Sequence, residues 1–257
     1  MKNGFQIVSV NEQNISDHPQ TVCYINPKHK SHHIKIDWLK QRFDEGYKIK
    51  LLYLEGEKRP SGFIEYTNGE NAWRAVSAEN YLFIHCIWVS ANKYKNKGIG
   101  STLVEDCNED AISRGLSGVA VVTSSGSFMA GGDLFRKCGF EVVEEAEPHY
   151  ELWVKAVKKG PLPRFNDWKT ALAHYTGLNI VYSKQCPWVA RFVDEITNNK
   201  KYNHLKINIT ELQTPRDAQK APSPYSTFNL IFNGKLLADH YISETRFKNI
   251  LTKEKIM

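Results

Sequence analysis

The segment "NKYKNKGIGSTLVED", residues 92–106, places lysines and glycines directly before an apolar, helix-like run. The first amide groups of a helix lack intrahelical partners and lie at the positive end of the helix dipole, so anions bind there. Gly98 and Gly100 let the backbone approach phosphate oxygens closely, and Lys95 and Lys97 add positive charge. The spacing fits neither the phosphate loop GxxxxGKS/T nor the dinucleotide pattern GxGxxG. The segment is therefore either another type of anion-binding turn or a tight turn with solvated lysines.

The other reactive side chains point to free thiols and to no metal. The five cysteines are odd in number and show no CxxC spacing, which favours a reducing compartment over disulfides or a zinc site. His29, His32 and His33 with Cys23 match no usual metal-ligand spacing, so we expect no metal. Cys186 lies between a predicted strand and a predicted helix, where the helix dipole lowers the pKa of a thiol. We treat it as a candidate thiol site.

Composition limits the partners of the chain. A net charge of +6, 41% hydrophobic residues and 24% charged residues are ordinary for a globular protein. No dense Lys/Arg block alternates with aromatic residues, so we expect no nucleic-acid partner. The first residues, "MKNGFQIVSV", lack the apolar stretch of a signal peptide, and no run approaches transmembrane length. We expect a cytoplasmic protein without a membrane partner.

Alternating strand and helix patterns predict an α/β (α+β) fold in two domains, residues 1–158 and 159–257. The run "YLFIHCIWVS" is almost continuously apolar, which is typical of a central strand, and the glycine segment follows it. The strands predicted in the first domain are 5–10, 47–56, 61–69, 81–90, 118–125, 140–146 and 150–157, and its helices are 31–46, 101–115 and 132–139.

The segment "KKGPLPRFND", residues 158–167, interrupts the pattern with glycine and prolines and marks the expected boundary. Beyond it the alternation of strands and helices restarts. The dipeptide Asn233-Gly234 predicts a hairpin turn, and Ser243 caps a final helix. The elements predicted in the second domain are strands 178–183 and 205–212, helices 186–199, 214–221 and 243–253, and a hairpin over 226–242.

Two segments together resemble a known family. Residues 95–100 resemble the acetyl-CoA loop of the GNAT acetyltransferases, Q/R-x-x-G-x-G/A, and "LFRKCGFEVVEE" resembles their second signature, LYxKxGF followed by a strand. The element order of residues 5–157 also matches, so the resemblance implies a mixed GNAT sheet with flanking helices. Lys95 stands where Gln or Arg is usual. Phe135 stands where the family often has a tyrosine that protonates the leaving thiolate.

The resemblance implies acetyl-CoA as co-substrate and an N-acetyltransferase whose small-molecule or peptide amine attacks the thioester directly. The pantetheine arm would lie between two splayed strands, along residues 87–89, and the pyrophosphate on the amides of residues 95–101. The residues thereby implied in cofactor binding are Ile87, Val89, Lys95, Asn96, Lys97, Gly98, Ile99, Gly100, Ser101 and Phe135.

The reaction requires a base, because a protonated amine must lose a proton before it attacks. His85 has an ordinary pKa near neutral pH, and its position coincides with one that holds the base in some GNAT members. Its alternative role is that of a hydrogen-bonded core histidine. Strand alternation predicts that His85 shares a face with Ile87 and lies opposite Cys86.

Glu65, on the neighbouring strand, is the second candidate base, and its alternative is a solvent-exposed carboxylate. Tyr150 or Ser127 would replace the missing tyrosine as general acid. Four residues are candidates for the acceptor pocket, with core packing and surface charge as the alternatives: Trp38, Tyr66, Trp73 and Arg74.

Residues 159–257 resemble a thioredoxin-like fold, and the combination resembles acetyltransferases with a YoaP-like C-terminal domain. "CPWV", residues 186–189, lacks the second cysteine of a redox motif, so dithiol chemistry is not expected. A single-thiol role for Cys186, substrate binding and a homodimer contact stay open for this domain. Two alternatives to the transferase also stay open: a non-catalytic acyl-CoA sensor, suggested by Phe135, and a thiol-handling redox protein centred on Cys186.

Overall fold

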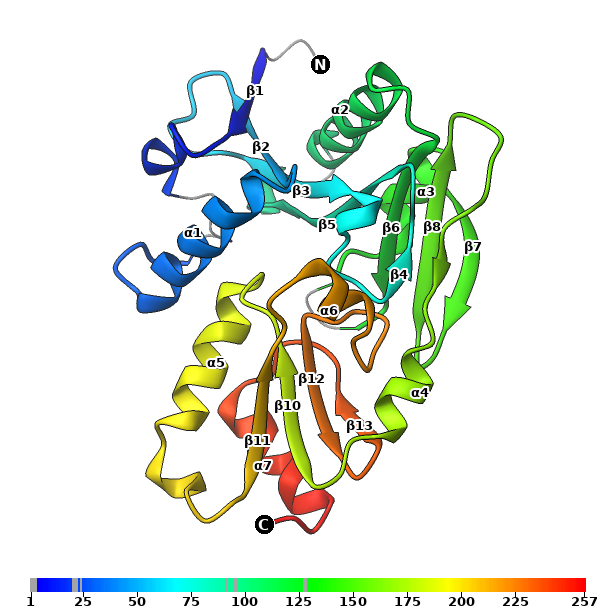
Figure 1. Ribbon diagram of the computed structural model, residues 1–257. Coiled ribbons are helices and arrows are strands. Elements are labelled where there is room, and N and C mark those ends of the chain that lie inside the picture. The colour runs from blue at the N-terminus through cyan, green and yellow to red at the C-terminus, as the bar shows by residue number, and fades with distance from the viewer. Residues whose placement is uncertain (1–3, 20–22, 24, 91, 95–96, 127–128) are drawn as a thin grey trace.

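The computed structural model describes residues 4–19, 23, 25–90, 92–94, 97–126 and 129–257. It contains a seven-stranded sheet with the order β1-β2-β3-β5-β6-β8-β7 and a four-stranded sheet with the order β11-β10-β12-β13. Figure 1 shows the larger sheet above the smaller one. Because parallel and antiparallel pairs occur in one sheet with helices beside it, the predicted α/β fold with a mixed sheet is confirmed.

The elements of the first half lie where the sequence patterns place them. The strands of the larger sheet are β1 (Phe5–Val10), β2 (Lys48–Leu54), β3 (Gly62–Asn68), β5 (Tyr81–Val89), β6 (Gly118–Ser124), β7 (Glu141–Ala146) and β8 (Tyr150–Ala156). The helices are α1 (Lys30–Phe43), α2 (Ile99–Ser113) and α3 (Gly132–Lys137), with short 3-10 turns η1 (Ile15–Asp17), η3 (Gly69–Asn71) and η4 (Asn92–Tyr94). Strand β5 is the middle strand of the sheet, as its apolar sequence predicts.

Helices α2 and α3 cover one face of the larger sheet (Figure 1). The apolar side of α2 supplies Ile99, Leu103 and Cys107 to a buried cluster that also contains Ile64 and Ile87 from the sheet. Alternate residues of β3 and β5 thus face α2, as expected for strands with a period of two.

The second half of the chain covers part of the opposite face. The strands of the smaller sheet are β10 (Leu178–Tyr182), β11 (Ile207–Glu211), β12 (Phe228–Phe232) and β13 (Lys235–Ala238). The helices are α4 (Trp168–Ala173), α5 (Pro187–Thr197), α6 (Pro215–Gln219) and α7 (Glu244–Lys253), with the turn η5 (Lys200–Tyr202). The expected turn between β12 and β13 is present, with positive φ at Asn233 and Gly234. Ser243 accepts a hydrogen bond from the N–H of Arg246 and caps α7 as predicted.

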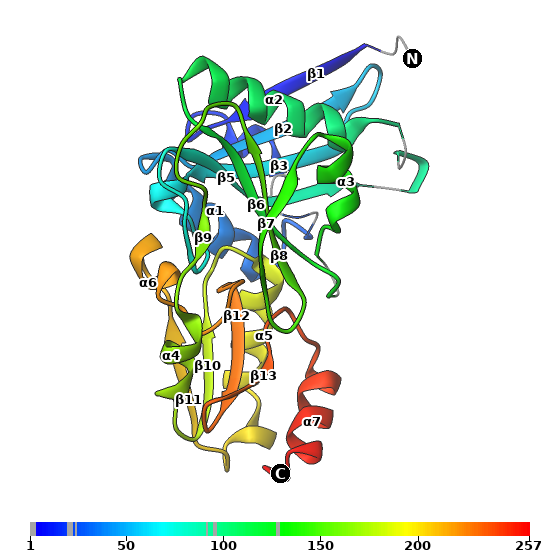
Figure 2. The same ribbon diagram turned by 90° about the vertical axis from the view of Figure 1, so that its right-hand side faces the viewer.

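The two halves share one hydrophobic cluster. Trp38 and Leu39 of α1 and Phe63 of β3 pack in a cluster that also contains Val181 and Ile231 from the smaller sheet. Helix α1 lies beside α5, and Figures 1 and 2 both show the smaller sheet directly against the first half. The interface between the halves therefore contains an apolar core and is not only a contact between two hydrated polar surfaces.

The segment between the halves is paired to the first half. Strand β9 (Arg164–Phe165) forms a two-stranded antiparallel pair with β4 (Val76–Ser77). The Asn166 side chain accepts a hydrogen bond from Ser77 and donates one to the carbonyl of Gln219 in the second half. The segment that follows residue 158 is therefore bonded to both halves. The domain boundary between residues 158 and 159 stays a prediction.

Within the residues described, no helix combines the length and the apolar character needed to cross a membrane.

Candidate active site

The glycine segment forms the start of α2. Gly98 is the N-cap, with φ of 79°, a backbone conformation that favours glycine. Gly100 lies against α3, where an added Cβ would be 3.2 Å from the Leu134 side chain. The structure thus brings Lys97, Gly98 and the amides of residues 99–101 to one helix N-terminus, while Lys95 and Asn96 lie outside the described residues.

Strands β5 and β6 separate next to this helix start. Their parallel pairing joins residues 81–84 to residues 118–121 only. Beyond Ile84, β5 pairs with β3 alone, and beyond Val121, β6 pairs with β8 alone. The edge of β5 that contains Ile87 and Val89 therefore faces a gap in the sheet, and the splay expected for the pantetheine arm is present in the fold.

Phe135 is fully buried in α3 and packs edge-on against Phe140, with 5.4 Å between ring centroids. It belongs to the same cluster as Ile99 and Leu103 of α2. Its predicted contact with the cofactor stays a prediction. The side chain offers no hydroxyl for proton transfer, so a general acid has to come from another position.

A bulge changes the face on which His85 lies. The β3–β5 register shifts between Glu65 and Tyr66, so Glu65 pairs with Cys86 but Tyr66 pairs with Ile84, and His85 is the extra residue. The prediction that His85 shares the face of Ile87 is therefore wrong. His85 instead lies with Cys86 on the face turned toward the second half, because a bulge interrupts side-chain alternation.

Glu65 and Lys35 form a fully buried ion pair, with 3.0 Å between Lys35 Nζ and Glu65 Oε2. Tyr47 donates a second hydrogen bond to the same oxygen at 2.6 Å. Glu65 is only 1% exposed, so it is not the solvated carboxylate that strand alternation allowed. Its other oxygen, Oε1, is buried and has no hydrogen-bond partner among the described residues.

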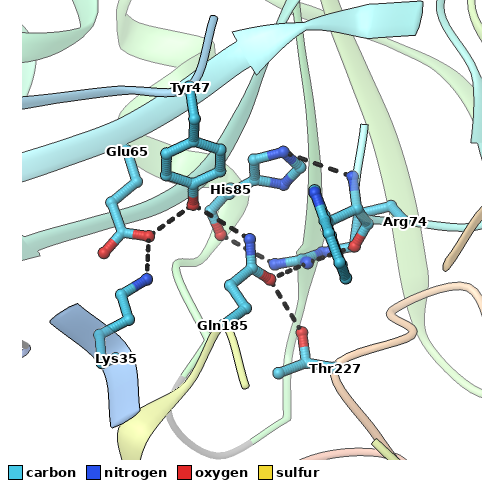
Figure 3. A network of polar contacts seen from close by, with 8 residues as sticks. Lys35, Tyr47, Glu65, Arg74, His85, Gln185 and Thr227 are labelled. Carbon is cyan, nitrogen blue, oxygen red and sulfur yellow. Dashed lines mark hydrogen bonds and ion pairs between the residues drawn. The ribbon is translucent and has the colours of Figure 1, made fainter. Parts of the chain in front are cut away.

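Gln185 extends this network into the second half of the chain (Figure 3). Its amide nitrogen donates to the Tyr47 hydroxyl at 3.1 Å, and its amide oxygen accepts from Arg74 at 2.6 Å. Thr227, just before β12, donates to the same amide oxygen at 3.3 Å. One chain of hydrogen bonds therefore runs from Lys35 through Glu65, Tyr47 and Gln185 to Arg74.

His85 is a buried, neutral histidine in this arrangement. Burial, followed by the charges of Arg74 and Lys35, holds the pKa of His85 well below its ordinary value. Its Nε2 accepts a long hydrogen bond of 3.4 Å from the Trp73 backbone, which assigns the ring proton to Nδ1. The ring stacks on Tyr47, with centroids 5.4 Å apart. Nε2, the ring nitrogen that could accept a proton, is thus already engaged by the Trp73 N–H.

A cavity of about 490 Å³ opens between the two halves at this network. Polar groups of the network reach it together with aromatic side chains from both halves. Its lining comprises Cys23, Phe63, Glu65, Arg74, His85, Cys86, Trp88, Ser90, Gln185, Cys186, Trp188, Tyr225, Thr227 and Tyr241. The combination of an apolar wall with a few buried polar groups is typical of small-molecule sites.

The four residues considered for the acceptor pocket separate in the structure. Arg74 lines the cavity, whereas Trp38 and Trp73 form a buried edge-on pair whose centroids are 5.0 Å apart. Tyr66 faces α2 on the other side of the sheet and donates to Asp110 at 3.1 Å. Only Arg74 of the four is therefore positioned to contact a ligand in this cavity.

Cys186 does not have the lowered pKa expected at a helix start. It is the N-cap of α5, and hydrogen bonds to the amides of Val189 and Trp188 act in the expected direction. Burial, followed by the neighbouring Cys23 thiol, outweighs them and raises the pKa of Cys186 to about 12. The expected lowering of the Cys186 pKa is thus wrong, because desolvation of this partly buried thiol outweighs the effect of the helix start.

Tyr150, the candidate acid, begins β8 and lines a different cavity, of about 600 Å³, beside α3. Burial, and then the carboxylate of Asp239, raises the pKa of Tyr150 far above its ordinary value, so its hydroxyl stays protonated at neutral pH. Its ring stacks at 6.2 Å on Tyr225, which lines the cavity between the halves. Ser127, the other candidate acid, lies outside the described residues.

Lys35, Tyr47 and Gln185 belong to the network but are not among the residues predicted from the sequence. Lys35 carried a recognisable signal, since it shares one helix face with Trp38, Leu39 and Arg42 and is nevertheless a cation. Among the described residues, no group of three or more His, Cys, Asp or Glu side chains is arranged to hold a metal ion.

The chain is similar in sequence to known acetyltransferases. Residues 14–140 match the acetyltransferase (GNAT) family model, and residues 206–249 match the YoaP-like model. An uncharacterized N-acetyltransferase, YoaP, of Bacillus subtilis strain 168 is 27% identical over 250 residues, which cover 95% of this chain and 97% of that protein. Residues 14–140 are thus similar to GNAT acetyltransferases and residues 206–249 to YoaP-like proteins, in the order that the sequence resemblance implies.

Solved acetyltransferase structures align with part of the chain. A GNAT-family acetyltransferase from Staphylococcus aureus Mu50 covers 60% of this chain and 100% of its own, at 12% identity and a TM-score of 0.45. A provisionally named streptothricin acetyltransferase from Bacillus anthracis strain Ames, in complex with acetyl coenzyme A, covers 62% and 100%, at 14% identity and a TM-score of 0.44.

Proposed function

We propose that the protein is an acetyl-CoA-dependent N-acetyltransferase that acts on the amine of a small molecule bound between its two halves. The observation that carries the proposal is the course of β5. This strand borders the gap in the sheet, ends at the loop before α2, and also presents His85 and Cys86 to the cavity. One strand therefore joins a site suited to a phosphorylated thioester to a site suited to its acceptor.

Acetyl-CoA, when bound, supplies an activated thioester carbonyl. The residues that would hold it fit its chemistry. Amides of residues 99–101, at the positive end of α2, suit the pyrophosphate, and the φ of Gly98 opens the turn in front of them. The unpaired edge of β5 at Ile87 and Val89 offers backbone groups to the amide-containing pantetheine arm.

Glu65 is the base that we propose for the amine. Its Oε1 is buried and unpartnered among the described residues, whereas Nε2 of His85 already accepts from Trp73. Lys35 and Tyr47 hold the other carboxylate oxygen and fix the orientation of the group. A carboxylate in this position accepts the ammonium proton directly or through one water.

Tyr150 is the acid that we propose for the departing thiolate in place of the hydroxyl that Phe135 lacks. Its hydroxyl has a proton to donate, and its ring stacks on Tyr225, which lines the acceptor cavity.

We further propose that residues 159–257 form a thioredoxin-like domain that serves substrate binding. The support is topological: β10 is parallel to β11 and antiparallel to β12, with α5 connecting β10 to β11. The raised pKa of Cys186 argues against thiol chemistry there, so its role is that of a cavity wall.

The test measures CoA released from acetyl-CoA with a panel of amines, together with acetyl-CoA affinity. Glu65→Gln is expected to lower kcat by about 100-fold or more while acetyl-CoA affinity is retained. Gly98→Asp is expected to abolish acetyl-CoA binding, because it sets a carboxylate where the pyrophosphate binds. Glu105→Gln, on the exposed side of α2, is the matched control for removing a carboxylate and is expected to change neither quantity.

An unchanged kcat in Glu65→Gln would transfer the role of base to His85. Loss of activity in Cys186→Ser together with full activity in Gly98→Asp would overturn the transferase in favour of a thiol-handling protein. Stabilisation by acetyl-CoA with no CoA release from any amine would identify a sensor.

A further inference from the structure

The charged groups of the cavity between the halves do not balance. Among the described residues that line it, Glu65 and Arg74 are the charged side chains, and Glu65 is already paired with Lys35. Arg74 is 2% exposed, and its hydrogen-bond acceptors among the described residues are all neutral: the carbonyls of Trp73 and His85 at 2.7 and 2.9 Å and the Gln185 amide oxygen at 2.6 Å. A positive charge is thus buried without a carboxylate.

Such a charge is costly without an anion. Removal of a guanidinium from water is repaid only when a counter-charge and good hydrogen bonds are provided, and neutral carbonyls supply the second but not the first. Arg74 also stacks over the Tyr225 ring, 4.0 Å from its centroid, and forms a hydrogen bond with the Tyr225 hydroxyl. These contacts hold the side chain in place and leave its charge uncompensated.

The donors of Arg74 are not exhausted by these partners. A guanidinium has five N–H donors, and the three acceptor atoms use three of them. Arg74 lines the cavity, so its remaining donors and its charge suit an anion bound there.

The rest of the cavity defines what the anion is attached to. Glu65, the proposed base, lies at the opposite end of the Tyr47–Gln185 hydrogen-bond chain from Arg74. Between these ends the wall is apolar and aromatic, with Phe63 and Trp88 from the first half and Trp188 and Tyr241 from the second. A volume of about 490 Å³ has room for a small molecule.

We propose that the acetyl acceptor is a small amino carboxylate with an apolar body, whose carboxylate binds Arg74 while its amine faces Glu65. The inference rests on the proposed function, since it names the substrate class of that site. Gln185 is a positioning residue in this arrangement, because its amide orients both the Arg74 guanidinium and the Tyr47 hydroxyl.

The experiment compares amines that differ only in a carboxylate: phenylalanine with phenethylamine, and methionine with 3-(methylthio)propylamine. In each pair the amino acid is expected to give at least a tenfold higher kcat/KM in CoA release. Arg74→Met is expected to lower the value for the amino acid at least tenfold more than the value for the matching amine, so that the preference within each pair is lost. Lys235→Met, which removes a cation bonded to Glu254 on the second half, is the matched control and keeps the tenfold preference.

A second readout uses the wild-type protein alone and does not depend on turnover or on the folding of Arg74→Met. N-acetylphenylalanine is expected to raise the melting temperature more than N-acetylphenethylamine at equal concentration. Equal kcat/KM within both pairs, equal stabilisation by the two products, or a preference that survives Arg74→Met would overturn the inference and leave the transferase intact. Absence of CoA release with every amine would instead count against the proposed function, and the two melting temperatures would still decide whether the protein binds the carboxylate form in preference.

Discussion

The loop before α2 and the buried polar network differ in how the chain builds them. The described loop residues 97–101 are consecutive, and their arrangement follows from one glycine and one helix start. The network takes Lys35, Tyr47, Glu65 and Arg74 from four elements or loops of the first half and Gln185 from the second. A site of the first kind is visible in a short stretch of sequence, whereas a site of the second kind exists only after long-range packing.

The loop and the network also differ in the free-energy cost of their polar groups. Lys97 and Gly98 of the loop are exposed, so the Lys97 ammonium remains hydrated and carries little desolvation cost. The network is buried, so each member depends on the others for hydrogen bonds and charge balance. Substitutions should therefore act mainly on ligand binding in the loop and on stability as well as activity in the network.

The largest effect on stability is expected from Lys35→Met. This change leaves the Glu65 carboxylate buried without its ion-pair partner, a loss of about 3–5 kcal/mol in the free energy of unfolding. Lys48→Met is the matched control, because its pair with Asp110 is 40% exposed on the lysine side and worth about 0–1 kcal/mol. Urea denaturation measures both. Equal losses in the two variants would show that the network is no more coupled than a surface pair.

A smaller effect is expected from pH. The pKa of His85 in the folded protein lies well below its ordinary value, so below about pH 6.5 the unfolded chain binds a proton that the folded chain does not. The free energy of unfolding should therefore fall as the pH falls below about 6.5, by up to about 1.4 kcal/mol per pH unit from this group.

Denaturation of the wild type and of His85→Gln between pH 8 and pH 5 measures this contribution. The variant should lose part of the slope, while His33→Gln, which removes an exposed histidine, should keep it. An identical slope in the wild type and His85→Gln would mean that His85 titrates normally and has no depressed pKa.

The smallest effect is expected in the loop. Gly98→Ala adds a Cβ where nothing lies within 4 Å, but φ of 79° is strained for alanine, so a loss of about 1 kcal/mol in stability is expected. Gly131→Ala is the matched control, because Gly131 also has open space but φ of −78°. Thermal unfolding compares the two variants. A stable Gly98→Ala variant with normal acetyl-CoA affinity would show that the turn tolerates side chains and would weaken its assignment to a phosphate.

Most of the fold could be predicted from local patterns. The central strand, the hairpins, the α5 start at a proline and the Ser243 cap all depend on neighbouring residues, and the structure has them where expected. The helix α4 and the β4–β9 pair were missed, because the pair is short and depends on partners almost ninety positions apart in the chain.

The candidate site was predictable only in its contiguous part. The bulge at His85 depends on the pairing register of β3 with β5, which alternation within one strand cannot reveal. The pKa of Cys186 depends on burial by a segment far away in sequence, which overcomes the local helix dipole. No sequence pattern around Gln185 indicates its role, because that role depends on its hydrogen bonds to Tyr47 and Arg74.

The position of Gln185 has a consequence for synthesis. A chain made from its N-terminus completes the strands of the larger sheet well before residue 185 is added, and N-terminal units generally fold first. Until the second half arrives, Tyr47 and Arg74 lack their amide partner, and the apolar patch formed by Trp38 and Phe63 lacks its cover. The nascent protein therefore passes through a stage in which the loop before α2 is complete but the cavity between the halves does not yet exist, and if the proposed function holds, activity appears only when the last third folds.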